Sequence, residues 1–198
     1  LGVDRQIKEF RANIELFLRG LPANATLLWG ARGTGKSSMI QAALAAYHDA
    51  GLRIIEVEKA YLSDLPSIVE CIRETPYRFL IYCDDLTFED GERAYSGLKT
   101  VLDGTLEEFG GNILVVCTSN RRHLVSEPSS ENLETTTVNG EIHQGDAIEE
   151  RISLSDRFGL WLSFYPYPQT IYIEIVKHWY QVLGKTLKLP DFTEEMAV

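Results

Sequence analysis

The sequence contains no apolar run of the length that a membrane-spanning helix needs, which is about 18 residues or more. Its first residues also lack the basic stretch followed by an apolar stretch that marks a signal peptide. We therefore predict a soluble, cytoplasmic protein without a membrane partner.

Cysteine is scarce as well. The three cysteines, Cys71, Cys83 and Cys117, form no Cys-x-x-Cys pair and show no metal-ligand spacing, and neither do the four histidines. Each cysteine lies in an apolar stretch, which is typical of a reduced core residue. We predict three buried, reduced thiols and no cysteine or histidine metal site.

Basic residues are fewer than acidic ones, 19 against 29, so the net charge is −10. Nucleic-acid binding usually depends on clustered Lys and Arg side chains that neutralise phosphates. Here the basic residues are scattered, and the only adjacent pair is Arg121-Arg122. The composition therefore gives no support to a nucleic-acid partner. Such binding would require a basic groove formed by residues from separate parts of the chain.

One motif is complete. Residues 30–37 read Gly-Ala-Arg-Gly-Thr-Gly-Lys-Ser, the G-x-x-x-x-G-K-[ST] phosphate-binding loop, between the apolar stretch 25–29 and a helix-forming run. Its glycines let successive N–H groups surround the phosphates, aided by the positive end of the following helix. We expect Lys36 to reach the β- and γ-phosphates and Ser37 to bind Mg²⁺. The motif predicts binding of a nucleoside triphosphate.

The predicted nucleotide-binding residues of this segment are Gly30, Ala31, Arg32, Gly33, Thr34, Gly35, Lys36, Ser37 and Ser38.

Strand-like and helix-like segments alternate along the chain. Apolar, β-branched stretches predict strands, and near-helical spacing predicts helices. The expected strands are 25–29, 52–57, 79–83, 113–117 and 160–165, and the expected helices are 3–18, 38–50, 63–74, 91–109 and 170–183. Strands that are apolar throughout and alternate with helices indicate an α/β fold, with a parallel sheet covered on both faces.

The stretch 125–146 differs from its surroundings. It contains five acidic residues and no Lys or Arg, and it includes Asn139-Gly140 between β-branched residues, a strong hairpin signal. We predict a β-hairpin inserted between the fourth and fifth strands. It is either a partner-contacting element or a surface insertion without a function.

Polar side chains follow the third and fourth predicted strands. Asp84 is expected to hold Mg²⁺, directly or through water, and Asp85 to orient or deprotonate the attacking water as general base. Asn120 comes to the same edge of the sheet and is expected to position that water.

These motifs resemble those of AAA+ ATPases over residues 1 to about 183. Residues 30–37 are similar to Walker A and residues 82–85 to Walker B, with Asn120 as sensor 1. The resemblance implies ATP and Mg²⁺ as ligands, and a five-stranded parallel sheet of order 5-1-4-3-2. It also implies that Gly2 and Val3 line the adenine site.

The phrases LLWGARGTGKSS, IYCDDLTFE, TSNRRHL and ISLSDRFGLWLSFYP resemble more closely a bacterial family of AAA+ proteins that is predicted to bind ATP and is known only as a domain of unknown function. The expected domains are a nucleotide-binding domain over residues 1–166 and a partial helical lid over residues 167–198.

Arg157 precedes the fifth strand, where AAA+ proteins carry an arginine finger. A planar, always charged guanidinium suits charge that develops on the γ-phosphate. In the family this arginine acts on the neighbouring subunit's nucleotide, so the resemblance implies a homo-oligomer with intersubunit sites. The alternative is an arginine that pairs locally with Glu150 or Asp156.

The chain departs from the AAA+ pattern twice. Asp85 stands where AAA+ enzymes usually have a glutamate, and this Asp-Asp ending resembles the replication initiator and helicase-loader branch. The shorter side chain predicts either slow hydrolysis or a site that needs more complete assembly. No arginine follows Arg157, so the sensor-2 arginine of the lid has no counterpart. Either the sequence is a fragment or sensor 2 is missing.

We therefore expect a Mg²⁺-dependent ATPase that drives the assembly or remodelling of an unidentified protein partner. One alternative is an ATP-switched nucleic-acid accessory protein that resembles helicase loaders. Another is a small-molecule P-loop kinase, which the absence of an arginine-rich lid disfavours.

Overall fold

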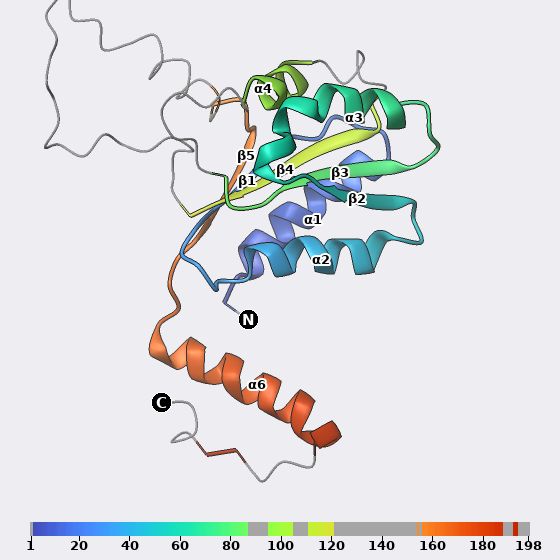
Figure 1. Ribbon diagram of the computed structural model, residues 1–198. Helices are drawn as coiled ribbons and strands as arrows, with labels where there is room; N and C mark the ends of the chain where they lie inside the picture. Colours follow the sequence, from blue (N-terminus) through green and yellow to red (C-terminus); the bar gives the residue numbers. More distant parts are fainter. Residues whose placement is uncertain are drawn as a thin grey trace, which may run out of the picture.

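The computed structural model describes residues 2–86, 95–104, 111–120, 154, 156–187 and 192–193. The hairpin predicted within 125–146 lies outside these residues. Five strands form one parallel sheet in the order β2-β3-β4-β1-β5 (Figure 1). They are β1 Thr26–Gly30, β2 Leu52–Glu56, β3 Arg78–Cys83, β4 Ile113–Ser119 and β5 Leu160–Phe164. The predicted α/β fold and strand order are confirmed.

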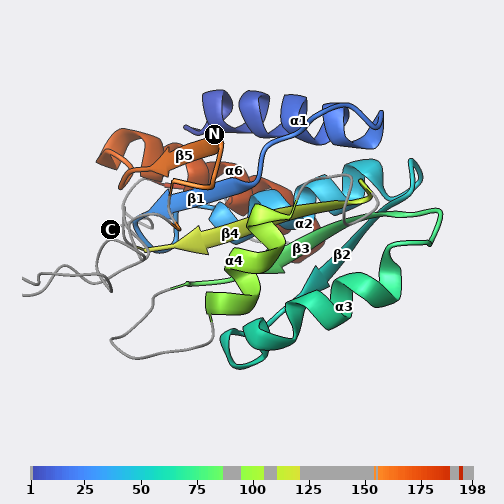
Figure 2. The same ribbon diagram turned by 90° about the horizontal axis from the view of Figure 1, so that it is seen from above.

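Helices cover both faces of the sheet (Figures 1 and 2). Helices α1 (Asp4–Leu18) and α2 (Lys36–Tyr47) lie on one face, and α3 (Leu65–Ile72) and α4 (Tyr95–Asp103) lie on the other. Alternate strand residues point to opposite faces, so Leu28 packs with the α1 and α2 side and Leu27 with the α3 and α4 side. Continuously apolar strands are thus buried on both sides.

A buried asparagine fixes α1 against the start of β1. Asn13 is 5% exposed and lies among the apolar residues of the inner face of α1. Its amide nitrogen donates to the Asn24 carbonyl oxygen at 2.8 Å and to Thr26 Oγ1 at 3.1 Å, and its amide oxygen accepts from the Asn24 N–H at 2.9 Å. The buried polar group is therefore satisfied, and it sets the position of α1.

The segments after β2 and β3 differ from the prediction. A 3₁₀ helix, η1 (Lys59–Asp64), precedes α3, so α3 begins at Leu65. Helix α4 ends at Asp103 and is followed by Gly104, and the rest of the predicted helix 91–109 lies outside the described residues. Within α4, a Cβ on Gly97 would lie 2.2 Å from the Leu62 carbonyl oxygen. Only glycine lets α4 pack this closely on η1.

The cysteine prediction is correct for two residues and wrong for the third. Cys83 and Cys117 are buried and directly opposed on β3 and β4. Burial raises the pKa of the Cys117 thiol well above its usual range. Cys71 is exposed, because it lies two positions after the buried Val69 and so points to the opposite side of α3.

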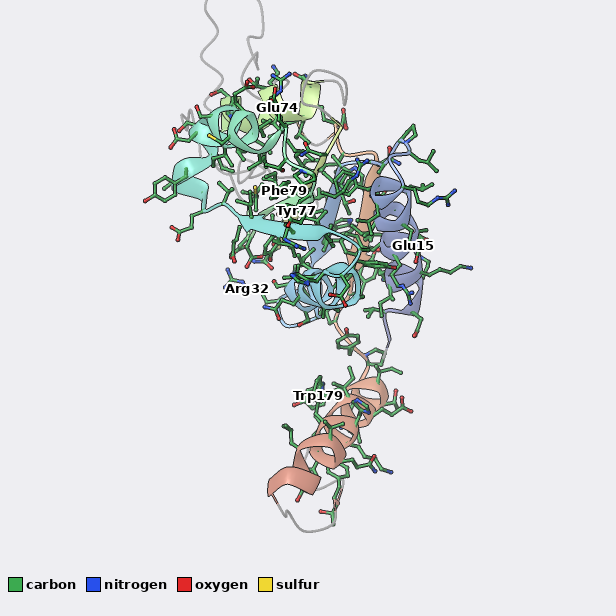
Figure 3. All side chains as sticks on the ribbon, turned by 90° about the vertical axis from the view of Figure 1, so that its right-hand side faces the viewer. Glu15, Arg32, Glu74, Tyr77, Phe79 and Trp179 are labelled. Carbon is green, nitrogen blue, oxygen red and sulfur yellow. The ribbon has the colours of Figure 1, made fainter. Side chains whose placement is uncertain are left out.

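Helix α6 (Gln169–Leu187) is longer than the predicted 170–183 and stands away from the sheet (Figures 1 and 3). It exposes large apolar side chains, among them Trp179, which is 56% exposed. Among the described residues, no helix has the length and apolarity needed to cross a membrane. The assignment of residues 167–198 to a partial lid stays a prediction.

Candidate nucleotide site

The phosphate-binding loop lies at the carboxyl edge of the sheet, between β1 and α2. Gly30 is the last residue of β1, and α2 begins at Lys36, two residues earlier than the predicted 38–50. Gly35 caps the helix with φ 94°, a left-handed value that favours glycine. Lys36, Ser37 and Ser38 therefore occupy the first turn of α2, where N–H groups remain available to an anion.

The loop is tied to itself and to β5. The Thr34 hydroxyl donates to the Ala31 carbonyl oxygen at 2.7 Å, and the Ala31 N–H donates to the Phe164 carbonyl oxygen at 2.9 Å. A Cβ on Gly30 would lie 1.9 Å from that same Phe164 oxygen. Gly30 is therefore required for the pairing of β1 with β5 as well as for the loop. Gly33, with φ 72°, turns the exposed part of the loop.

Lys36 lies folded back into the loop. It is 8% exposed, and its Nζ donates to the carbonyl oxygens of Gly30 at 2.9 Å and Ala31 at 2.8 Å. It also donates to Asn120 Oδ1 at 3.3 Å. Burial lowers the pKa of Lys36, against the attraction of Asp85 and Asp84. The ammonium group is therefore placed between the loop and the carboxyl ends of β3 and β4.

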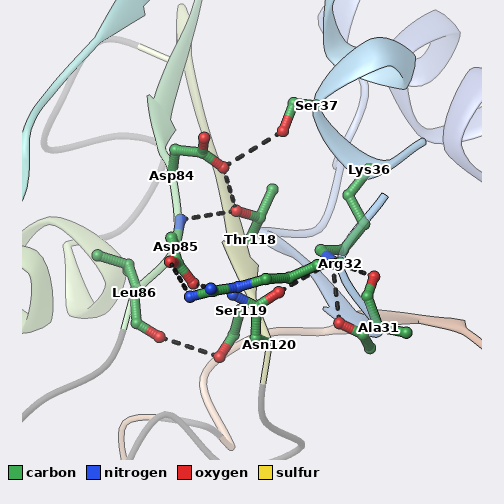
Figure 4. A network of polar contacts seen from close by, with 11 residues as sticks. Ala31, Arg32, Lys36, Ser37, Asp84, Asp85, Leu86, Thr118, Ser119 and Asn120 are labelled. Atoms are coloured by element: carbon green, nitrogen blue, oxygen red, sulfur yellow. Dashed lines mark hydrogen bonds and ion pairs between the residues drawn. The ribbon is translucent and has the colours of Figure 1, made fainter. Parts of the chain in front are cut away.

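Asp84 faces the start of α2. Its Oδ1 accepts from the Thr118 hydroxyl at 2.5 Å and from the Ser37 hydroxyl at 3.4 Å (Figure 4). Burial alone would raise the pKa of Asp84, but hydrogen bonds, first among them that from Thr118, lower it below its usual value. The carboxylate therefore favours the charged form that binds a cation.

The residues at this position fit Mg²⁺. The ion prefers oxygen ligands and keeps several waters, and the Ser37 hydroxyl and the Asp84 carboxylate supply oxygens. Beside them lies the buried Tyr82 hydroxyl, which has no hydrogen-bond partner among the described residues. A hydrated cation between Ser37 and Asp84 meets the chemistry of all three groups.

Asp85 points across the site towards the loop. It is the one described residue other than glycine with positive φ, at 47°, and its N–H donates to Thr118 Oγ1 at 2.8 Å. Its carboxylate accepts a hydrogen bond from Asn120 Nδ2 and pairs with the Arg32 guanidinium at 3.4 Å (Figure 4). The left-handed backbone turns the Asp85 side chain away from that of Asp84 and towards Asn120.

Thr118 is a site residue that the sequence reasoning missed. It is 1% exposed, and its single hydroxyl accepts from the Asp85 N–H while donating to the Asp84 carboxylate. It therefore fixes both acidic residues from the neighbouring strand. The signal was a hydroxyl residue at the point where the apolar run of β4 ends, two positions before Asn120.

The segment predicted to line the adenine site reaches the loop through a tyrosine. Val3 is the N-cap of α1, and a Cβ on Gly2 would lie 3.0 Å from both the Tyr167 ring and Ile171. The Tyr167 hydroxyl in turn donates to the Thr34 carbonyl oxygen at 2.7 Å. The chain start, the phosphate-binding loop and the start of α6 therefore meet around Tyr167.

Arg157 lies at the other edge of the sheet. It precedes β5, and its Nε donates to the Asp103 carboxylate at the end of α4. The observed partner is thus Asp103 and not Asp156, one of the two predicted local partners. The other, Glu150, lies outside the described residues. Arg157, Asn24 and Gly111 border a hollow of about 280 Å³ at this edge. The structure does not bring Arg157 to the loop of its own chain.

Similarity to solved structures establishes the fold. The chain is 16% identical to RuvB of Thermotoga maritima, described as a Holliday junction branch migration motor, with a TM-score of 0.56 over 91% of this chain and 51% of that one. It is also 16% identical to AMPPCP-bound DnaA of Aquifex aeolicus, with a TM-score of 0.60 over 100% of this chain and 56% of that one. The chain thus spans about half the length of each and shares the AAA+ fold.

No curated protein matches the chain by sequence. One family model, described as "Protein of unknown function (DUF815)", matches residues 1–197. The sheet order and the loop are those of AAA+ P-loop proteins. Because the family match covers nearly the whole chain, the chain belongs to the DUF815 family.

Proposed function

We propose that this chain binds ATP with Mg²⁺ and hydrolyses the ATP. The observation that carries the proposal is the hydrogen-bonded network that joins Lys36, Asn120 and Asp85 on one side and Ser37, Thr118 and Asp84 on the other. The six residues come from three elements, the start of α2, the end of β3 and the end of β4, and all of them meet at the carboxyl edge, where open α/β sheets bind ligands.

Each residue has a defined task in this proposal. Lys36 exchanges its bonds to the loop carbonyls for the β- and γ-phosphates, and the N–H groups of the loop surround those phosphates. Ser37 and Asp84 hold Mg²⁺, which neutralises charge on the phosphates when bound. Asn120 orients the attacking water, and Asp85 takes its proton. The short Asp85 side chain favours slow turnover.

Geometry favours a second copy as the source of the arginine. Arg157 lies before β5 and the loop lies beside the end of β5, and five strand residues span about 17 Å. A side chain at one end of β5 cannot contact a phosphate at the other. We therefore propose that Arg157 of a neighbouring copy stabilises the charge on the γ-phosphate, so that the active form is a homo-oligomer.

Purified protein tests the residue assignments by ATP binding and by Mg²⁺-dependent release of phosphate. Lys36→Ala is expected to lose both, whereas Asp85→Asn is expected to bind ATP without turning it over. The matched control Lys8→Ala removes an exposed lysine of α1 and is expected to behave like the wild type. Full turnover by Lys36→Ala contradicts the proposal.

Mixing of variants tests the shared site. Arg157→Ala and Asp85→Asn are each expected to be inactive, while a co-assembled mixture regains part of the activity, because some interfaces combine an intact Arg157 with an intact Asp85. Arg73→Ala removes an exposed arginine paired with Glu70 on α3 and serves as the control. No recovery in a co-assembled mixture argues against an arginine that acts on the neighbouring copy.

We propose that hydrolysis drives the assembly or remodelling of a macromolecular partner. The similar structures include a Holliday junction branch migration motor and a DNA replication initiation factor, which keeps a nucleic-acid partner as the second candidate. The net charge of −10 disfavours it. Salt-sensitive, ATP-dependent binding of single-stranded DNA would favour this second candidate, whereas a protein captured specifically by Asp85→Asn with ATP would favour the first.

A further inference from the structure

Tyr82 lies on β3 two residues before Asp84, so both side chains point to the same face of the sheet. That face is covered by α1 and α2, and the Tyr82 ring belongs to the core that includes Met39 and Ile40 of α2. The residue is 6% exposed. The ring is therefore a core side chain next to the Asp84 carboxylate, which is the proposed Mg²⁺ ligand.

The end of this side chain is polar and unsatisfied. The Tyr82 hydroxyl is fully buried and makes no hydrogen bond of acceptable geometry with any described residue. Burial raises the pKa of Tyr82, and Asp84, Ser37 and Thr118 are close enough to influence it as well. The hydroxyl thus lies beside the Ser37 hydroxyl and the Asp84 carboxylate, close enough to help lower the pKa of Asp84, without a hydrogen bond of good geometry to either.

A buried hydroxyl without a partner destabilises a protein, and phenylalanine would fill the same space without that cost. The hydroxyl would be satisfied if a further polar group entered this space. Mg²⁺ brings such groups, because it dehydrates reluctantly and keeps several bound waters whose orientation depends on surrounding hydrogen bonds. A neutral phenol is a poor direct ligand beside a carboxylate, so a water of the ion is the suitable partner.

We infer that the Tyr82 hydroxyl hydrogen-bonds to a water bound to the Mg²⁺ ion between Ser37 and Asp84, and that it thereby raises the Mg²⁺ affinity of the nucleotide site. The inference rests on the proposed function. Tyr82 is a positioning residue in this role, since it acts on the ion through the water.

The test is a Mg²⁺ titration of the affinity for a fluorescent ATP analogue, with the wild type, Tyr82→Phe and the matched control Tyr47→Phe. Tyr47 is also on the α2 side, but its hydroxyl bonds to Glu15 at 2.6 Å and to Arg11 at 3.3 Å, away from the site. The Mg²⁺ concentration that gives half of the tightening is expected to rise about three- to tenfold in Tyr82→Phe, as for the loss of one hydrogen bond, and to stay unchanged in Tyr47→Phe.

Melting without nucleotide provides the second readout. Tyr82→Phe is expected to melt at the same temperature as the wild type or higher, because it removes an unsatisfied group. A lower melting temperature overturns the inference, since it means that the hydroxyl already has a partner.

Two binding results also overturn it and can be told apart. If Tyr82→Phe binds the analogue with the Mg²⁺ dependence of the wild type, the inference fails and the proposed function stands. If the wild type binds no ATP analogue at any Mg²⁺ concentration, the proposed function fails, and the inference fails with it.

Discussion

The two edges of the sheet carry different kinds of polar structure. At the carboxyl edge, Asp84 and Asp85 are joined by one buried threonine, and a lysine and an asparagine complete the network. At the amino edge, Arg157 pairs with Asp103 beside a hollow of about 280 Å³. The first edge is organised by several mutual hydrogen bonds within one chain, whereas the described contact of the second is a single, partly exposed ion pair.

This difference indicates which groups of the proposed site act within their own chain and which group acts on a neighbouring copy. Groups that must keep fixed positions relative to one another are linked to neighbouring strands by hydrogen bonds through the buried Thr118 and Lys36. Arg157, which must reach another molecule, is bonded to a partly exposed aspartate, and such ion pairs are weak. Variants of Asp84 and Thr118 at the carboxyl edge should therefore lower activity, whereas weakening the contact of Arg157 with Asp103 at the amino edge should raise it.

The largest effect is expected for Asp84→Asn. The amide keeps the size of the side chain but removes the charge that binds the cation, so Mg²⁺-dependent phosphate release should fall about a thousandfold. Phosphate release and Mg²⁺-dependent analogue binding measure the loss. Asn13→Asp is unsuitable as a control, because it would add charge inside the core. The control is Glu70→Gln, which neutralises the exposed partner of Arg73 on α3 and should retain activity.

Thr118→Val is expected to have the next largest effect. It keeps the shape of the buried side chain but removes the hydroxyl that positions both carboxylates, and it leaves the Asp85 N–H unsatisfied. Turnover should fall about ten- to a hundredfold, and the free energy of unfolding should drop by about 1–3 kcal/mol. Thr118→Ser keeps a hydroxyl, and a denaturant melt together with phosphate release should show it near the wild type. A loss in Thr118→Ser with none in Thr118→Val would mean that the methyl group matters and the hydroxyl does not.

Asp103→Asn probes the amino edge and should raise activity. It weakens one contact that holds Arg157 within its own chain, and partly exposed pairs of this kind contribute up to about 1 kcal/mol. Turnover at low protein concentration should therefore increase up to about fivefold. Turnover is measured over a range of protein concentrations. A gain from easier contact between copies should vanish at high concentration, whereas a gain from faster chemistry should persist. A loss of activity would make Asp103 part of the site and break the contrast between the two edges.

Arg32→Gln is expected to have the smallest effect. The Arg32 side chain is 82% exposed and pairs with Asp85 at 3.4 Å, so its removal frees the Asp85 carboxylate without disturbing a buried group. Affinity for an ATP analogue should change less than about threefold. Analogue binding at low and high salt measures it, because any contribution from this exposed pair should decline with salt. A tenfold loss would show that Arg32 contacts the nucleotide.

The sheet was predictable because its strands are short, apolar throughout and separated by clear helix-forming segments. The loop at residues 30–37 was predictable because its eight positions follow one chemical requirement. Asp84, Asp85 and Asn120 followed from their place after buried strands, since parallel strands bring their carboxyl ends to one edge. The structure brings these residues together, although their roles stay predictions.

What the sequence did not reveal depends on contacts between distant residues. The double role of Thr118 requires the register of β4 against β3, and the unsatisfied Tyr82 hydroxyl requires the packing of α2. Gly97 reads as a weak helix residue until η1 is placed against it. The pairing of Arg157 with Asp103, 54 positions away, also depends on the fold, while the expected partner Glu150 lies outside the described residues.

Two hydrogen bonds couple the phosphate-binding loop to the segment that joins β5 to α6. The Ala31 N–H bonds to Phe164 and the Tyr167 hydroxyl bonds to Thr34, so the loop is attached to both ends of the short connection that leads to α6. Pro166 and Pro168 stiffen that connection. Helix α6 has 19 residues and is therefore about 28 Å long. A tilt of about 5° at its base would therefore move its far end by about 2.5 Å.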